Sequence, residues 1–265
     1  MPNVERPSPR GRAAPGTLDH LTEFTLASFN AHWGRGRFGS HHREDFDVVP
    51  IVRGFDADVV VVLESWREPD GRGLLDGLVA DGYRVETVEF ATMVISARRA
   101  RQSVPGEGRW ELSICSRLPV VARRELPIGH VPGDPAGRRT ALQCTVDVGG
   151  VEVDVVGVHV SSRLWELAPV RHLRVLQSQL PGRDRAAVIA GDCNLWGPAV
   201  EALLPGWHRA VRGRTYPAHR PHSQIDHVLV RDDVSVVWSE VLAATPSDHR
   251  PVRARLRVGR EPQTR

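Results

Sequence analysis

The sequence predicts an α/β fold with a strand-rich middle, and three observations support this prediction. Short apolar runs of strand length recur along the 265-residue chain, and its 24 glycines and 20 prolines suit many turns between short elements. Helix-like stretches lie between these runs instead of following them as a block. Several runs are apolar on both faces, which is typical of sheets covered on each side. No repeat or linker interrupts the chain between its tails, so a single domain is expected.

Runs rich in Val, Ile and other β-formers predict the strands, which in chain order are FTLASFN, DVVVVLES, TMVISA, ELSICS, TALQCTVDV, VEVDVVGVHV, AAVIAGDCN, QIDHVLV, VSVVWSEVL and VRARLRV. Gly149 and Gly150 separate two of them, and both glycines can take the positive φ of a tight turn, which predicts a hairpin. The last run alternates between apolar residues and arginines, which predicts a strand with one face in water.

Apolar residues at helical spacing predict helices near residues 44–55, 73–81 and 164–180. Residues 1–22 are rich in Pro, Arg and Gly and predict a disordered N-terminal tail. Residues 259–265 predict a flexible C-terminus, so the single domain is expected over residues 23–258.

The composition limits which binding partners and which cellular compartment can be expected. The 35 Lys and Arg residues exceed the 32 Asp and Glu residues, giving a net charge of +3 that is compatible with phosphate-bearing partners but too mild to identify them. The three cysteines, in strand-like runs, lack the paired spacing of a zinc site and predict buried thiols in a reducing compartment. No stretch has the length of a secretory signal or a membrane span, so we expect cytoplasmic localisation and no integral membrane association.

The run VIAGDCNLW ends an apolar strand with an acid and an amide. Because side chains alternate along a strand, Asp192 and Asn194 are predicted to share one face, whereas Cys193 faces the opposite way. Gly191 beside them indicates either a turn or a close approach of two backbones.

The same pattern, an apolar strand followed by a polar side chain, recurs along the chain at Asn30, Glu64, His159, Asp192, Asn194, Asp226, Asp248 and His249. Each case alone has a structural explanation as a cap, a turn or a buried histidine. Burying all of these polar side chains together would cost much free energy unless they converge on one site that binds a cation. Oxygen donors suit a hard ion such as Mg²⁺, which predicts metal-assisted attack by water, with histidines neutralising an oxyanion.

The ordered set SFN, LES, SICSRLPVV, VHVSS, GDCN, QIDHVLV and SDHRPV resembles the endonuclease/exonuclease/phosphatase superfamily. The resemblance extends from about Phe24 to Leu256. It implies a four-layer α/β sandwich, in which two packed mixed sheets lie between outer helices and the site lies where both sheets open to solvent.

The resemblance also implies a metal site and its ligands. Glu64 is similar to the family's principal Mg²⁺ ligand, with Asn30 as its partner and Asp248 as an additional ligand; Mn²⁺ is an alternative ion. Leu63 precedes Glu64 where many family members have Gln, so a supporting hydrogen bond is expected to be missing.

The catalytic roles are likewise implied by the resemblance. Asp192 is similar to the acid that orients or deprotonates the attacking water, and Asn194 to the amide that holds the scissile phosphate. Asp226 is similar to the carboxylate that orients His249, which stabilises the phosphoryl oxygens or handles a proton. His159 is similar to a second phosphate-binding imidazole. Apurinic endonucleases usually carry Tyr at that position, which counts against abasic-site repair.

Residues near these motifs are candidate substrate contacts. A Gly-rich basic loop follows Asn30 and is expected at the rim of the site, with Arg35, Arg37, His41 and His42. Trp33 and Trp196 each follow a motif and are candidates for stacking on a base or ring. Arg138 and Arg139 fit either a phosphate contact or a solvated strand entry. His227 should face away from Asp226 by alternation.

Three functions remain open from the sequence. The first is a Mg²⁺-dependent phosphodiesterase that acts on nucleic acid by attack of water on phosphorus. The second is a phosphatase or phosphodiesterase for a small phosphoester or a lipid head group. The third is a catalytically silent binding module, which the presence of Glu64, Asp192 and His249 together disfavours.

Overall fold

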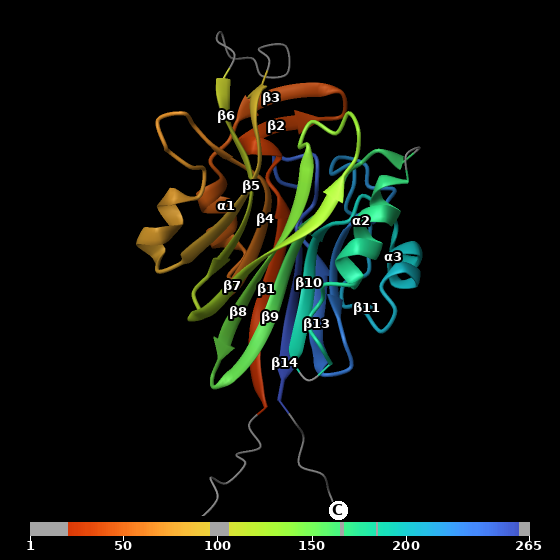
Figure 1. The fold of residues 1–265 in the computed structure, drawn as a ribbon. Coiled ribbons are helices and arrows are strands. Elements are labelled where there is room, and N and C mark those ends of the chain that lie inside the picture. The colour runs from red at the N-terminus through yellow and green to blue at the C-terminus, as the bar shows by residue number, and fades with distance from the viewer. Residues whose placement is uncertain (1–20, 96–105, 165–166, 184, 260–265) are drawn as a thin grey trace, which may run out of the picture.

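The computed structural model describes residues 21–95, 106–164, 167–183 and 185–259. Two six-stranded mixed sheets pack face to face in these residues, and helices cover their outer faces (Figure 1). The first sheet has the strand order β13 (Val234–Val241), β14 (Val252–Val258), β1 (Thr22–Asn30), β4 (Val59–Arg67), β6 (Gly106–Ser116), β5 (Arg84–Ile95). The second has the order β11 (His208–Arg209), β12 (Asp226–Val230), β10 (Ala186–Asp192), β9 (Val151–His159), β8 (Arg138–Val148), β7 (Val120–His130). A small separate sheet pairs β2 (Arg35–Phe38) with β3 (His41–Asp45).

The core follows from strands that are apolar on both faces. In β4, Val61 packs between the two sheets, whereas Val60 packs against α1 on the outside. In β10, Val188 packs between the sheets and Ile189 packs against α2 and α3. The predicted four-layer α/β sandwich is therefore confirmed. The helices of the described ranges are α1 (Val48–Gly54), α2 (Ala168–Gln177) and α3 (Gly197–Leu203), with short 3-10 turns η1 (His32–Gly34) and η2 (Asp76–Asp81).

Each predicted strand is found in the structure, except that residues 96–97 of the run TMVISA lie outside the described residues. Four strands were not predicted: β2, β3, β7 and β11. β7 is an edge strand with Arg123, Arg124 and Pro127 and with most of its residues exposed, so it lacks the apolar alternation that identifies a half-buried strand. β11 is only two residues long.

The predicted helix over residues 44–55 is wrong at its start. Residues 44–45 belong to β3, and α1 begins at Val48 because the Asp47 carboxylate accepts a hydrogen bond from the backbone N–H of Val49 and caps the helix. The other two predicted helices are shorter than expected: the second is the 3-10 turn η2, and the third is α2. Residues 165–166 of the third lie outside the described residues.

The hairpin between β8 and β9 is confirmed, with φ of 61° at Gly149 and 92° at Gly150. The predicted tails fall outside the described residues except at their inner ends, where Thr22 opens β1 opposite Val258 of β14. Within the described ranges, no helix has the length and apolarity needed to cross a bilayer.

The strand register brings the polar strand ends together. β1 runs parallel to β4, with Asn30 opposite Leu63, and β9 runs parallel to β10, with His159 opposite Asp192. β12 runs antiparallel to β10, so that its first residue, Asp226, also lies opposite Asp192. The two sheets thus present these ends at one edge of the sandwich.

Candidate active site

Glu64 reaches the site because β4 is irregular at this point. The register of β4 against β6 shifts between Val62 and Ser65, and Glu64 has a φ of 51°. A regular strand would place Glu64 on the same face as Val62, which packs in the outer layer with α1. The bulge turns the carboxylate toward the site instead. A left-handed backbone at a residue other than Gly is strained, and such strain is common at functional positions.

Asn30 joins the two sheets through its side-chain amide. Its Nδ2 lies 3.2 Å from Glu64 Oε1 and 3.4 Å from Asp192 Oδ2. Its Oδ1 accepts a hydrogen bond of 3.0 Å from the backbone N–H of His32, which orients the amide so that its N–H groups face the carboxylates. Asn30 therefore contacts one acid from each sheet, and its predicted role as a metal ligand stays a prediction.

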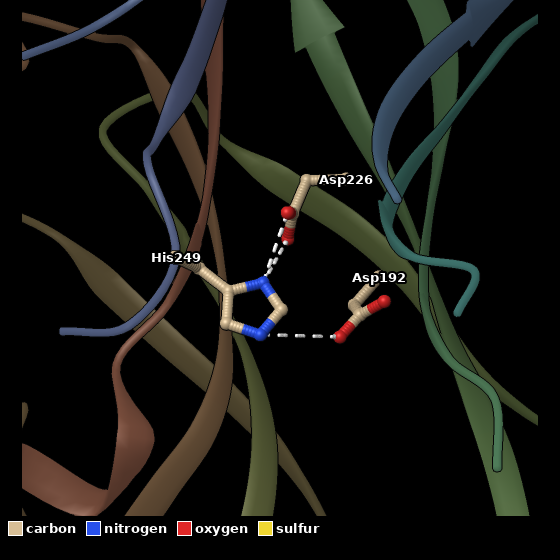
Figure 2. A group of neighbouring side chains, drawn as sticks. All are labelled: Asp192, Asp226 and His249. Atoms are coloured by element: carbon tan, nitrogen blue, oxygen red, sulfur yellow. Dashed lines mark hydrogen bonds and ion pairs between the residues drawn. The ribbon is translucent and has the colours of Figure 1, made fainter. Parts of the chain in front are cut away.

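His249 is oriented by one acid and approaches another (Figure 2). Its Nδ1 lies 2.9 Å and 3.1 Å from the two carboxylate oxygens of Asp226, and its Nε2 lies 3.9 Å from Asp192 Oδ2. Burial lowers the pKa of His249, but the charge and hydrogen bond of Asp226 outweigh burial and raise it to about 10. The ring is therefore a cation at neutral pH, with Nε2–H free to donate.

His159 has the opposite charge state. Its Nε2 lies 3.8 Å from both Glu64 Oε1 and Asp192 Oδ2, and its ring packs edge-on against Trp110 at 5.6 Å. Burial, followed by the positive charge of Arg139, lowers its pKa well below the usual value. The imidazole is therefore neutral.

Asn194 follows β10 with a φ of 44°. Its backbone N–H donates to Asp192 Oδ1 at 2.7 Å, and its side-chain Nδ2 donates to the carbonyl of Val160 at 3.0 Å. These bonds fix the Asp192 carboxylate so that Oδ2 faces Asn30 and the two histidines. As predicted, Cys193 faces the opposite way and is buried against the outer helices.

Asp248 lies at the edge of the site. Its Oδ2 is 3.1 Å from Nη1 of Arg37, and its Oδ1 is 4.0 Å from Nε2 of His249. The preceding Ser247 donates to the carbonyl of Asn30 at 2.7 Å and accepts from the backbone N–H of His249 at 3.2 Å. This serine fixes the loop that carries both residues against the end of β1.

The residues present fit a divalent cation. Glu64 Oε2 and Asp248 Oδ1 are buried oxygens with no hydrogen-bond partner among the described residues. Burial and the negative charge of Asp248 raise the pKa of Glu64 to about 7, and burial and Asp226 raise that of Asp192. Crowded acids with unpaired oxygens need a positive ion, and oxygen donors suit a hard divalent one.

A second grouping of acids and histidine is a weaker metal site. Asp192, Asp226 and His249 offer ligand atoms within 4.8 Å of one another. However, Nδ1 of His249 is already hydrogen-bonded to Asp226, and a protonated imidazole cannot bind a metal. The Asp226–His249 hydrogen bond leaves only the Nε2 atom of this ring facing Asp192.

These residues surround a cavity of about 520 Å³. Most of the predicted site residues line it, namely Trp33, Glu64, His159, Asp192, Asn194, Asp248 and His249. Asn30 and Asp226 lie behind this surface and act through their neighbours. His227 faces away, as predicted, and bonds to the carbonyl of Leu195.

The structure corrects the predicted substrate contact at Arg35. Its side chain is only 5% exposed and does not line the cavity, whereas Arg37, two residues further along β2, does. The register of β2 against β3 shifts between these two positions, which the sequence did not reveal. Trp196 is 61% exposed but lies outside the cavity lining, and His41 lines a different hollow; the side chain of His42 is outside the described set.

Several lining residues were left open or missed by the sequence patterns. Arg139 is buried, bonded twice to Asp134 at 3.0 Å, and lies over the Trp110 ring at 4.6 Å, whereas Arg138 is solvated. Tyr216 packs against His249 with ring centroids 4.8 Å apart. Neither Trp110 nor Tyr216 follows a strand end, so the pattern used for the acids could not find them.

Comparisons with known proteins agree with this geometry. Residues 27–249 match the Endonuclease/Exonuclease/phosphatase family. No curated protein sequence matches the chain at a significant level. Three solved structures share its fold: an endonuclease/exonuclease/phosphatase from Beutenbergia cavernae DSM 12333 (TM-score 0.70, 24% identity, 90% of this chain and 72% of that one), a mannosyl-6-phosphatase from Bacteroides thetaiotaomicron VPI-5482 (0.65, 18%, 88% and 99%), and a humanized D. rerio TDP2 (0.60, 16%, 88% and 98%).

The family match spans most of the chain, and it includes the strand ends that carry the acids and histidines of the cavity. Members of this family hydrolyse phosphoesters, generally with a divalent metal. The chain is therefore a phosphoesterase that belongs to the endonuclease/exonuclease/phosphatase family.

Proposed function

We propose that this protein is a Mg²⁺-dependent phosphodiesterase that acts on nucleic acid. The observation that carries the proposal is the division of one cavity into two halves. Glu64 and Asp248 each offer a buried carboxylate oxygen that accepts no hydrogen bond from the described residues on one side, and Asp192 faces the Asp226–His249 pair on the other. Phosphodiester hydrolysis uses both halves, because one must neutralise phosphate and the other must activate water.

The residues of the second half activate the water and stabilise the developing charge. Asp192 accepts the proton of the attacking water at Oδ2, and His249 donates its Nε2–H to a phosphoryl oxygen as negative charge develops there. The ester oxygen leaves with the bonding electron pair and takes a proton from solvent. When bound, a divalent ion held by Glu64 and Asp248 supplies Lewis-acid polarisation of the phosphoryl oxygens.

Nucleic acid is the substrate that the cavity walls favour. Trp33 lines the cavity, is only partly buried, and offers ring surface for stacking on a base or sugar. Arg37 adds a guanidinium with 35% of its side chain exposed, and the sequence pI is about 9.1. A cavity of about 520 Å³ is large enough for a nucleotide unit.

A second candidate is a phosphatase or phosphodiesterase for a small or lipid-linked phosphoester. The same volume fits a sugar phosphate, and one structural neighbour is named a mannosyl-6-phosphatase. The catalytic groups are identical for both candidates, so the substrate distinguishes them.

We also propose a cytoplasmic location. The three cysteines are free and buried, as expected for thiols in a reducing compartment.

A cleavage panel tests the proposed function. Plasmid DNA, single-stranded DNA, RNA, a sugar phosphate and a phosphoinositide are incubated with Mg²⁺, with Mn²⁺ or with chelator. We expect cleavage of nucleic acid that depends on the divalent ion. Cleavage of the sugar phosphate or phosphoinositide alone would favour the second candidate, and full activity in chelator would exclude the metal mechanism.

Matched variants test the proposed roles. Asp192→Asn and His249→Gln should each lower kcat by roughly 10²–10⁴-fold, because each removes a group that transfers a proton or stabilises charge. Asp232→Asn and His208→Gln make the same changes at an exposed pair and should leave kcat unaltered. Equal activity of the site variants and these controls would contradict the assignment.

A further inference from the structure

Two hydrogen-bond donors at the edge of the catalytic cavity have no acceptor among the described residues. The hydroxyl of Tyr216 makes no hydrogen bond with them, although the residue lines the cavity. Arg37 donates from Nε to the carbonyl of Gly39 at 3.0 Å and from Nη1 to Asp248 at 3.1 Å, and its Nη2 bonds to none of the described residues. Both residues are tied to Asp248: Arg37 through its Nη1, and the segment after Tyr216 through the backbone N–H of Ala218, which donates to the carbonyl of Asp248 at 2.7 Å.

Tyr216 is fixed in place by the backbone around it. Its N–H donates to the carbonyl of Ser223, and its own carbonyl accepts from the N–H groups of His222 and Ser223. The preceding Thr215 accepts from the backbone N–H of Asp226 through Oγ1. The same turn that supports Asp226 therefore fixes the Tyr216 ring against His249, and the position of the hydroxyl follows from that of the ring.

Arg37 lies where two hollows meet. It lines the catalytic cavity and also an adjoining hollow of about 790 Å³ between the β2–β3 hairpin and residues 244–246. Phe38 in this second hollow is 49% exposed. A substrate that is longer than one unit can therefore leave the catalytic cavity past Arg37.

We propose that Tyr216 and Arg37 form a subsite for a second phosphate, the one next to the scissile phosphate in a nucleic acid strand. The guanidinium is planar, so it bonds Asp248 along one edge and presents Nη2–H to a phosphate oxygen along another. The Tyr216 hydroxyl donates to the same group. This inference rests on the proposed function, and it makes the enzyme prefer a strand over an isolated phosphodiester.

The preference is measured with the smallest substrates that differ by one phosphate. The dinucleoside phosphate TpT has only the scissile group, whereas pTpT and TpTp carry one more phosphate on either side. With Mg²⁺ present, we expect the wild type to show a higher kcat/KM for pTpT or TpTp than for TpT, by about tenfold, which corresponds to about 1.4 kcal/mol of added binding.

Two conservative variants test the residues. Tyr216→Phe keeps the ring on His249 and removes the hydroxyl. Arg37→Lys keeps a cation beside Asp248 and removes the planar guanidinium with its Nη2–H donors. Each variant should lower, at least threefold, the ratio of the kcat/KM for pTpT or TpTp to the kcat/KM for TpT. The controls are Tyr83→Phe, whose buried hydroxyl bonds to the carbonyl of Ala57, and Arg53→Lys, whose partner is Asp81; both should keep the wild-type ratio.

The outcomes separate the subsite from the proposed function. If the wild type hydrolyses TpT, and if the kcat/KM of pTpT or TpTp relative to that of TpT is the same in the wild type and in both variants, the subsite alone is overturned. A wild type that cleaves no nucleic acid in Mg²⁺ overturns the proposed function, and the subsite with it. Thermal unfolding of each variant near the wild-type temperature confirms that a changed ratio reports binding and not misfolding.

Discussion

His159 and His249 show how surroundings decide the role of a side chain. Each has Nε2 within 4 Å of Asp192 Oδ2, at 3.8 Å and 3.9 Å. His249 has a carboxylate at Nδ1 and is cationic, whereas Nδ1 of His159 has no partner among the described residues and its ring lies against Trp110. His249 therefore presents a charged N–H donor to Asp192, and His159 presents a neutral ring to the same carboxylate.

A third buried histidine makes a prediction about stability. His172 in α2 is 1% exposed, and burial followed by the charge of Arg139 lowers its pKa from 6.5 to about 4. Between these values the unfolded chain binds a proton that the folded chain excludes, so stability is complete above about pH 6.5 and falls as pH falls toward 4. His172→Gln should reduce the loss of unfolding free energy between pH 7 and pH 5 by about 2 kcal/mol.

Urea unfolding at the two pH values measures this difference. His208→Gln, at an exposed histidine, is the control and should show the wild-type loss. An acid sensitivity that is the same in all three proteins would contradict the low pKa of His172.

At the scale of elements, the β9–β10 pair depends on a glycine. Gly191 has a φ of 147°, and a Cβ there would lie 1.9 Å from the carbonyl oxygen of Val158. The two backbones therefore approach more closely than any other residue allows.

Gly191→Ala should destabilise the protein by about 3 kcal/mol or more, because the strand must shift and the backbone is strained. It should also lower activity, since Asp192 is the next residue. Gly54→Ala is the matched control, because nothing lies within 4 Å of its Cβ and its φ is ordinary. Chemical denaturation measures both variants; similar stabilities would contradict the close approach.

The elements also show what the sequence could predict. Buried strands have patterns that identify them, and the polar residues at their ends were found because each interrupts an apolar run, as Asn30 and Asp192 do. The bulge at Glu64 and the edge strand β7 leave no comparable pattern, since both depend on pairing with distant residues. Register and bulges are tertiary properties, and this is why the sequence named Arg35 and Arg37 alike, although only Arg37 of the two lines the cavity.

At the scale of the molecule, each sheet supplies part of the candidate site. Glu64, Asn30 and Asp248 come from the first sheet and the segment that leads into β14. Asp192 and Asp226 come from β10 and β12 of the second sheet. His249 follows Asp248 in the first half but is oriented by Asp226 of the second. The site is therefore complete only when the two sheets are packed.

A divalent ion should stabilise the whole fold, because it neutralises acids that the folded state crowds together. With Mg²⁺ at about 100 times its Kd, we expect about 2.7 kcal/mol of added stability and a rise in Tm of about 5–10 °C. Differential scanning fluorimetry with Mg²⁺, with chelator, and with NaCl of equal ionic strength measures this effect.

Glu64→Gln should change both the stability of the metal-free protein and the rise in Tm that Mg²⁺ causes. Without metal it should be at least as stable as the wild type, since it removes a buried charge whose pKa burial raises to about 7. With Mg²⁺ it should show little further increase in Tm. An increase equal to that of the wild type would remove Glu64 from the metal site.

The pairing of Thr22 with Val258 has a practical consequence. β1 starts beside the end of β14 and runs the length of the sandwich to Asn30, so both strands meet the outside at the end away from the catalytic cavity (Figure 1). A surface anchor or a fluorescent protein joined directly before β1 or directly after β14 would leave the mouth of the cavity accessible. Immobilised enzyme could then be studied with phosphoester substrates of any length.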